Sequence, residues 1–139
     1  MLTLSVGCQD YHWRWDYEVA EREAREQGKF LFIFYKGPWD NASNRMHGDV
    51  LADNEVGSLF QDTINLFLQE VSEEHGTYVK KYGVTRPPAC VLVGPDGVPK
   101  VRTGYVPKQN FIKFAQQAMS VGADKKARPE GHRPTAPAE

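Results

Sequence analysis

Two cysteines, Cys8 and Cys90, are the side chains of this sequence with the greatest capacity for covalent chemistry. They lie far apart in the chain and are too few for a disulfide-rich scaffold. Cys90 stands inside the apolar run Ala89-Cys90-Val91-Leu92-Val93, where a free cysteine is expected to be buried as a small hydrophobic side chain. A reactive thiol would instead require exposure and a nearby cation. That alternative is a thiol-dependent oxidoreductase using the single Cys90.

A carboxylate and a hydroxyl, Asp40 and Ser43, form a second candidate for chemistry. A helix is expected to start near Asp40 or Asn41, directly after Gly37-Pro38-Trp39. A carboxylate at a helix N-cap accepts backbone N–H hydrogen bonds and meets the positive end of the helix dipole, which is worth about 0.5–2 kcal/mol. We therefore interpret Asp40 as a capping residue, with a non-redox catalyst built on Asp40 and Ser43 as the alternative.

Other chemistries have little support in the sequence. The four histidines are scattered without the spacing of metal ligands, and there is no Gly-rich loop of the kind that binds phosphate. The net charge of -1 gives no general electrostatic reason to bind nucleic acid or an anionic membrane. We expect no metal, no cofactor and no nucleic-acid partner.

The segment Leu4-Ser5-Val6-Gly7-Cys8 is similar to the end of a bacterial lipoprotein signal, in which the cysteine receives a lipid. Ser5 stands where an aliphatic residue is usual, so a free cysteine in an N-terminal arm of residues 1–12 is the alternative. Lipidation at Cys8 is the one route to a membrane that the sequence offers. It predicts a periplasmic or membrane-tethered protein, and without it a cytoplasmic location is the alternative.

Residues 11–17 are the densest aromatic stretch of the chain. One interpretation is that Trp15, together with Trp13, packs onto the sheet. The other is that Tyr11, Trp13 and Tyr17 belong to an exposed protein-binding patch, because aromatic residues dominate the energetics of interfaces.

Apolar patterns and turn residues predict the order of the secondary-structure elements. Six apolar or aromatic residues without alternation, Phe30 to Tyr35, indicate a strand buried on both faces. Gly94-Pro95-Asp96-Gly97 between two apolar runs is typical of a hairpin. The full prediction is helices over 16–27, 40–53, 73–82 and 107–119, a helical turn over 56–60, and strands over 30–35, 63–68, 89–93 and 98–103.

This order predicts an α/β fold, a three-layer α/β/α sandwich with a mixed central sheet. A helix between two buried strands implies a right-handed parallel crossover, and the closing hairpin adds antiparallel strands. The domain is expected to span residues 13–121. Residues 122–139 have no large apolar side chain and are expected to form a disordered tail.

Three local signatures, in this order, resemble the thioredoxin superfamily, most of all its exported bacterial branch. They are the segment Trp15 to Lys29, with its Ala-containing helix; Tyr35-Lys36-Gly37-Pro38-Trp39 after the first buried strand; and Tyr82 to Ala89, which is similar to the family's Tyr-Gly-Val-x-x-x-Pro-Thr segment. The resemblance implies the thioredoxin-like fold over roughly residues 13 to 120.

The sequence departs from the family where the family carries its chemistry. After Trp39 the resemblance implies a Cys-x-x-Cys motif, but the chain has Asp40-Asn41-Ala42-Ser43. Thiol exchange needs a thiolate and a second sulfur that resolves the mixed disulfide. We therefore expect no dithiol oxidoreductase activity from these positions.

The resemblance aligns Pro88 with the family's cis-proline, whose loop faces the motif and presents backbone groups to extended peptides. Carried over, it implies a shallow binding groove on the former active-site face, formed by Trp39, Asp40, Asn41, Ser43, Arg86, Pro87 and Pro88. Pro87 next to Pro88 removes one backbone donor from this loop. The prediction is a redox-inactive module that binds a protein or peptide as an accessory or assembly factor in a bacterial envelope; a structural subunit of a larger complex is the alternative.

Overall fold

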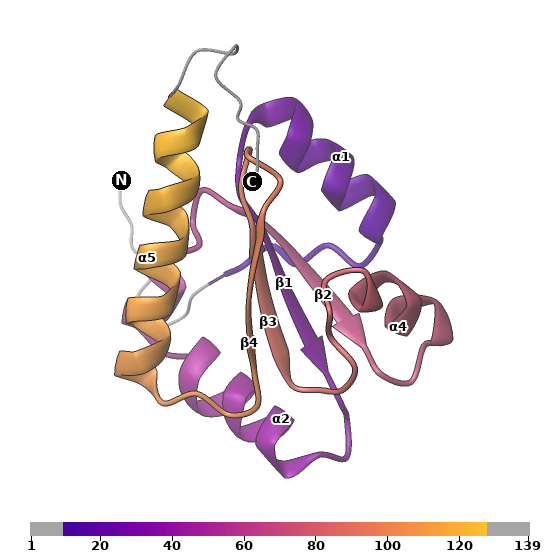
Figure 1. Cartoon of the computed structure of the whole chain (residues 1–139). Helices are drawn as coiled ribbons and strands as arrows, with labels where there is room; N and C mark the ends of the chain where they lie inside the picture. The colour runs from indigo at the N-terminus through magenta and orange to yellow at the C-terminus, as the bar shows by residue number, and fades with distance from the viewer. Residues whose placement is uncertain (1–9, 128–139) are drawn as a thin grey trace.

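The computed structural model describes residues 10–127, with the backbone alone described for residues 121–127. Five α-helices, one π-helical segment and four strands follow one another along this part of the chain (Figure 1). Their bounds are α1 Tyr17–Gln27, β1 Leu31–Lys36, α2 Asn41–Arg45, η1 Met46–Leu51, α3 Asn54–Ser58, β2 Ile64–Gln69, α4 Glu73–Lys80, β3 Ala89–Val93, β4 Pro99–Thr103 and α5 Lys108–Ala127.

The four strands form one mixed sheet in the order β2-β1-β3-β4. β1 runs parallel to β2, with Leu31 opposite Ile64, and antiparallel to β3, with Leu31 opposite Val93. The parallel pair requires a crossover, which α2, η1 and α3 supply, whereas β3 and β4 need only the tight turn at Gly94 to Gly97. The predicted α/β/α sandwich with a mixed sheet is confirmed.

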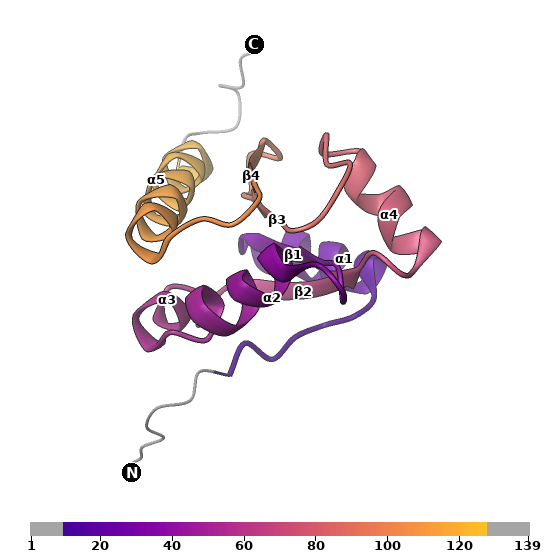
Figure 2. The ribbon, with the colours of Figure 1, turned by 90° about the horizontal axis from the view of Figure 1, so that it is seen from below.

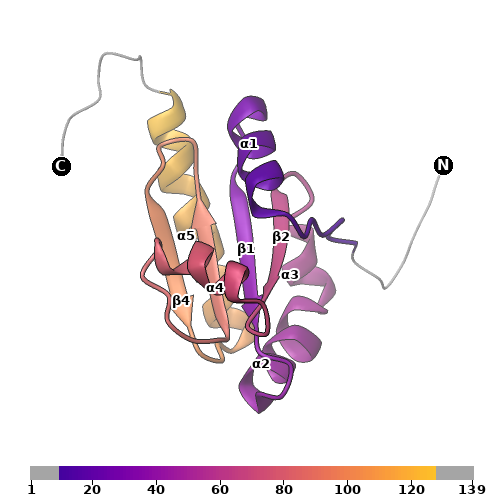
Figure 3. The same cartoon turned by 90° about the vertical axis from the view of Figure 1, so that its right-hand side faces the viewer.

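Two layers of helices cover the sheet, as Figures 2 and 3 show from below and from the side. The side chains of β1 alternate between the two cores, so Phe32 and Phe34 face α5 and η1 while Ile33 faces α1 and α4. The core beneath α5 is rich in aromatic rings, and the core beneath α1 and α4 is built mainly from aliphatic and small side chains. Because β1 packs against both cores, the start of the loop that follows β1 is held in place.

Helix α1 is capped at both ends. Asp16 accepts a hydrogen bond from Val19 N, and Gly28 ends the helix with a left-handed φ of 67°. Gly is the residue that adopts this conformation at low cost, which explains the stop at this position. Ala20 and Ala24 are buried against the sheet, whereas Val19 is exposed.

Both predicted ends of the domain need correction. Tyr11 belongs to the buried core, so the domain begins before residue 13 and the predicted arm is too long. Helix α5 continues to Ala127, past the predicted end at Met119 and the predicted start of the tail at 122. One Gly costs a helix only about 1 kcal/mol, and the Ala and Lys residues after Gly122 are strong helix formers. Residues 128–139 lie outside the described residues.

Candidate functional site

The loop between β1 and α2 presents the residues that the sequence singled out for chemistry. Asp40 is the N-cap of α2, where its Oδ2 accepts hydrogen bonds from Ser43 N at 2.9 Å and from Ser43 Oγ at 2.8 Å. Ser43 Oγ in turn accepts a hydrogen bond from Gly37 N at 3.0 Å. The capping interpretation of Asp40 is confirmed, and the network ties the start of the helix to the end of the strand.

Ser43 is held in a position that opposes nucleophilic chemistry. Its side chain is fully buried, and its one hydroxyl proton is donated to the Asp40 carboxylate. A nucleophile must reach the substrate, and here the loop itself covers the hydroxyl. The Asp40–Ser43 pair therefore stabilises the loop, and the buried Ser43 hydroxyl is not accessible to a substrate.

The loop before β3 lies beside this segment at the lower end of the sheet in Figure 1. Arg86 is exposed, Pro87 is half-buried and Pro88 is buried, and the peptide bond between the two prolines is cis. The carbonyl of Pro88 accepts a hydrogen bond from Gly104 N at 2.8 Å, which continues the pairing of β3 with β4. A backbone hydrogen bond thus connects the loop to the sheet, and Arg86 of the same loop is exposed.

The two loops meet at Gly37. A Cβ atom built on Gly37 would lie 2.9 Å from Pro87 Cγ and 2.9 Å from Glu70 Oε1, closer than real Cβ contacts allow. Gly37 is therefore required by the close approach of its neighbours. The structure brings the Trp39 loop and the proline loop together, as the resemblance implied.

Glu70 is a member of this face that the sequence analysis missed. It follows β2 directly and donates its backbone N–H to Lys36 O at 2.9 Å. The position of Glu70 just after a predicted strand could have indicated this, because the carboxyl ends of neighbouring parallel strands meet at the same edge of a sheet. The side chain of Glu70 is exposed, so it adds a negative charge beside the loop.

Trp39 and Asn41 are, with Arg86, the exposed members of the predicted groove. Trp39 is 86% exposed, the highest value among the large apolar side chains of the described residues. Asn41 is the first residue of α2 and also faces solvent, whereas Asp40 is half-buried by its capping bonds. The site thus consists of the hydrogen bonds among Gly37, Asp40 and Ser43, with the exposed side chain of Trp39 beside them.

A lysine–histidine contact flanks this loop and was also missed. Lys36 Nζ lies 2.9 Å from His47 Nδ1, and since an ammonium only donates, Nδ1 accepts and the ring proton resides on Nε2. The ring packs against Phe34 and Phe67. Burial, and then the charge of Lys36, lower the pKa of His47 below its ordinary value. His47 is therefore held neutral near pH 7.

Cys90 lies in the core beneath α5 and is 2% exposed. Burial raises the pKa of its thiol well above the ordinary value. Thiolate formation and access are both needed for thiol exchange, and this position provides neither. The interpretation of Cys90 as a small hydrophobic core residue is confirmed.

The hypothesis of an exposed aromatic patch at residues 11–17 is wrong for Tyr11 and Tyr17, because both are buried. Tyr11 stacks on Trp13 at 4.6 Å between ring centroids and donates its hydroxyl to Leu51 O. Trp13 is half-buried and packs against the same core. Trp15 contacts Phe67 but remains 53% exposed. The stretch is mainly structural, and Cys8 lies outside the described residues.

The described residues contain neither a metal cluster nor a membrane-spanning helix. Within residues 10–120, no three His, Cys, Asp or Glu side chains gather closely enough to hold a metal ion. No helix in the same part of the chain is long and apolar enough to cross a membrane.

The sequence of the domain matches the family model of the thioredoxin-like domain over residues 17–119. The chain belongs to this family. Among solved structures, this thioredoxin-like domain is similar to a thioredoxin from Thermus thermophilus, at 20% identity and a TM-score of 0.70, covering 91% of this chain and 96% of the other. It is also similar to the oxidised C-terminal domain of Neisseria meningitidis DsbD, at 20% identity and a TM-score of 0.65, covering 76% and 97%. No curated protein matches the chain.

These likenesses extend to proteins that handle disulfides. A disulphide isomerase from Xylella fastidiosa has a TM-score of 0.57 at 15% identity, covering 74% of this chain and 88% of the other. At such identities the likeness shows the fold alone. The thioredoxin-like domain is thus related to disulfide oxidoreductases in fold, and its activity has to be argued from its own residues.

Proposed function

We propose that this chain is a redox-inactive thioredoxin-like module that binds an extended segment of a partner protein over Trp39 and the proline loop. The observation that carries the proposal is the 86% exposure of Trp39 at the point where β1 ends and α2 begins. Exposing a tryptophan to water is unfavourable, and an exposed tryptophan is a frequent anchor of protein interfaces.

The absence of sulfur supports the redox-inactive part. At the start of α2, where dithiol relatives place two cysteines, the chain has Asp40 and Ser43. The remaining thiol within the described residues, Cys90, is buried in the core. No thiolate is available at the face where a disulfide of another protein would have to approach.

The chemistry of the face indicates how a partner would be held. Arg86 is exposed on the neighbouring loop, and arginine is, like tryptophan, enriched at interface hot spots. Pro87 and Pro88 have no N–H to donate, so strand-like backbone pairing at this loop is limited to carbonyl acceptors. Side-chain contacts of Trp39 and Arg86 therefore have to supply most of the affinity.

An accessory or assembly role in a bacterial envelope belongs to the same proposal. Mass spectrometry of the native N-terminus tests lipidation: a lipid adduct on Cys8 supports the envelope location, and an intact Met1 rules lipidation out.

Site-specific photo-crosslinking tests the binding face. A photoreactive phenylalanine analogue is placed at Trp39 in the native host, and the same analogue at Trp15, the other exposed tryptophan, is the matched control. The proposal predicts a discrete protein adduct from position 39 that Arg86→Glu weakens, and none from position 15. No adduct from position 39, or equal adducts from both positions, would refute it.

A further inference from the structure

The outer edge of β4 has backbone groups without a partner. β4 pairs with β3, and the bond from Gly104 N to Pro88 O fixes which residues face that neighbour. Since hydrogen-bonded pairs alternate along an antiparallel ladder, the N–H and C=O groups of Val101 and Thr103 point away from β3. No described residue bonds to these groups. Such an edge is a template for another strand.

The side chains of β4 on the α5 side are cationic. Lys100 lies opposite Leu92 and Arg102 opposite Cys90, and both partners belong to the core beneath α5. Arg102 lies over the ring of Phe114, with its guanidinium carbon 5.9 Å from the ring centroid. Lys100 and Arg102 thus lie on the side of β4 that faces helix α5.

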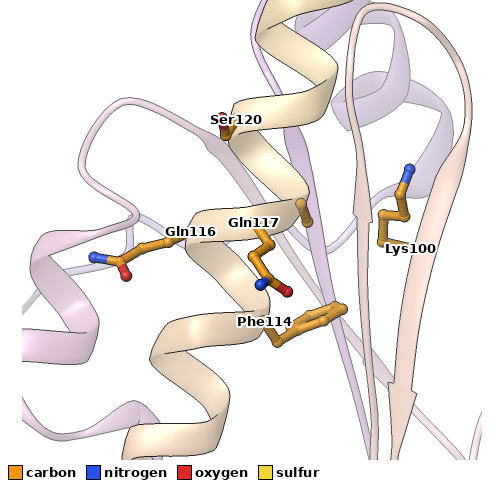
Figure 4. A pocket seen from close by; sticks show the side chains of 6 residues that line it. Lys100, Phe114, Gln116, Gln117 and Ser120 are labelled. Carbon is orange, nitrogen blue, oxygen red and sulfur yellow. The ribbon is translucent and has the colours of Figure 1, made fainter.

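An open groove lies between Lys100 and helix α5. It has a volume of about 590 Å³ and is lined by Lys100 on the strand and by Phe114, Gln117 and Ala118 on α5. Figure 4 shows Lys100 and the ring of Phe114 on opposite sides of this space. The floor is therefore apolar and the strand side is charged.

The charges of the groove are not neutralised within the described part of the chain. Arg14, Lys29 and Lys108 each form an ion pair with a carboxylate. Neither Lys100 nor Arg102 has such a partner among the side chains of residues 10–120. A segment that carries negative charge would therefore complement Lys100 and Arg102.

We propose that the groove between β4 and α5 binds an extended acidic segment of a partner protein, which adds as a strand to β4. Its backbone pairs with Val101 and Thr103, and carboxylates at alternating positions meet Lys100 and Arg102, because residues two apart on a strand share one face. This surface is separate from the Trp39 face, so its test does not depend on the proposed function.

The test is fluorescence anisotropy of a labelled peptide of alternating glutamate and valine, titrated with the full-length chain. The control peptides are alternating lysine and valine, and a block peptide with the same composition as the probe. Binding of the alternating acidic peptide in preference to both controls is expected, because charge and alternation are both required.

Two variants separate the contributions. The double variant Lys100→Glu/Arg102→Glu should weaken binding by about ten-fold or more, because two attractions become repulsions. Thr103→Pro removes one outward N–H without touching the pairing with β3, and should weaken binding by about five-fold. Lys80→Glu, a single charge reversal on the opposite helical layer, should leave binding unchanged, and thermal unfolding checks that each variant is folded.

Three results would overturn the proposal. They are failure of the full-length chain to bind the alternating acidic peptide, equal binding of the lysine peptide, and unchanged affinity in the folded double variant. A concentration-dependent dimer that Thr103→Pro abolishes would assign the edge to a second copy of this chain and would also overturn it.

Discussion

The start of α2 and the position of Cys90 in β3 differ in what they offer thiol chemistry, and each lacks what the other has. Asp40 and Ser43 occupy a helix start beside the exposed Trp39, but neither carries sulfur. Cys90 carries sulfur, but the core encloses it. Position and sulfur have to coincide for disulfide exchange, so the comparison explains why a thioredoxin-like fold alone does not imply the activity.

The largest expected effect concerns access to Cys90. In a Cys8→Ser background, Ellman's reagent should label Cys90 at least about a thousand-fold more slowly in the native state than in denaturant, because labelling requires opening of the core. Trp39→Cys in the same background is the exposed control and should be labelled rapidly. Rapid labelling of Cys90 in the native state would show that its thiol is accessible and would contradict its burial in the core.

Gly37→Ala tests the contact between the loop after β1 and the loop before β3. The new Cβ would lie 2.9 Å from the ring of Pro87, and overpacking of this kind lowers the free energy of unfolding by about 2 kcal/mol. Gly48→Ala is the matched control, since a Cβ there meets nothing within 4 Å and the helix should gain up to about 1 kcal/mol. Urea unfolding measures both. Equal effects of the two changes would show that the loops are not in contact.

Ser43→Ala tests whether the hydroxyl is structural. The variant leaves the buried N–H of Gly37 without its acceptor, so the free energy of unfolding should fall by about 1.5 kcal/mol. Asn41→Ala, on the exposed side of the same helix start, should change stability by less than about 0.5 kcal/mol. A neutral Ser43→Ala would mean that the serine is free for another role.

The smallest effect is a pH dependence from His47. Because its pKa is lowered in the folded chain, the unfolded chain takes up a proton first as the pH falls below the ordinary value of 6.5. Stability should therefore be retained above this pH and decline below it. His47→Gln should flatten this decline in urea unfolding at several pH values, and His12→Gln, at an exposed site, should not. An unchanged slope in His47→Gln would contradict the assignment.

Much of the fold could be predicted because its signals are local. The unbroken apolar run of β1, the turn at Gly94 to Gly97 and the cap at Asp40 each follow from neighbouring residues. The crossover and the mixed sheet follow from the order of these elements.

The site could be predicted less completely because its contacts join distant segments. The meeting of Gly37 with Pro87 and Glu70 depends on how three loops end at one edge of the sheet. The burial of Tyr11 depends on the segment before α1 running beside β2, where Arg14 N bonds to Asn65 O. No local pattern at Tyr11 distinguishes this packing from an exposed aromatic patch.

Reduction of insulin by dithiothreitol, measured in parallel for the native chain and for Asp40→Cys/Ser43→Cys, tests whether missing sulfur is what prevents disulfide exchange. We expect the native chain to leave the uncatalysed rate unchanged and the double variant to accelerate it, because the fold supplies the position and lacks only the sulfur. Turnover by the native chain, above all turnover that disappears in Cys90→Ser, would show that the chain is redox-active.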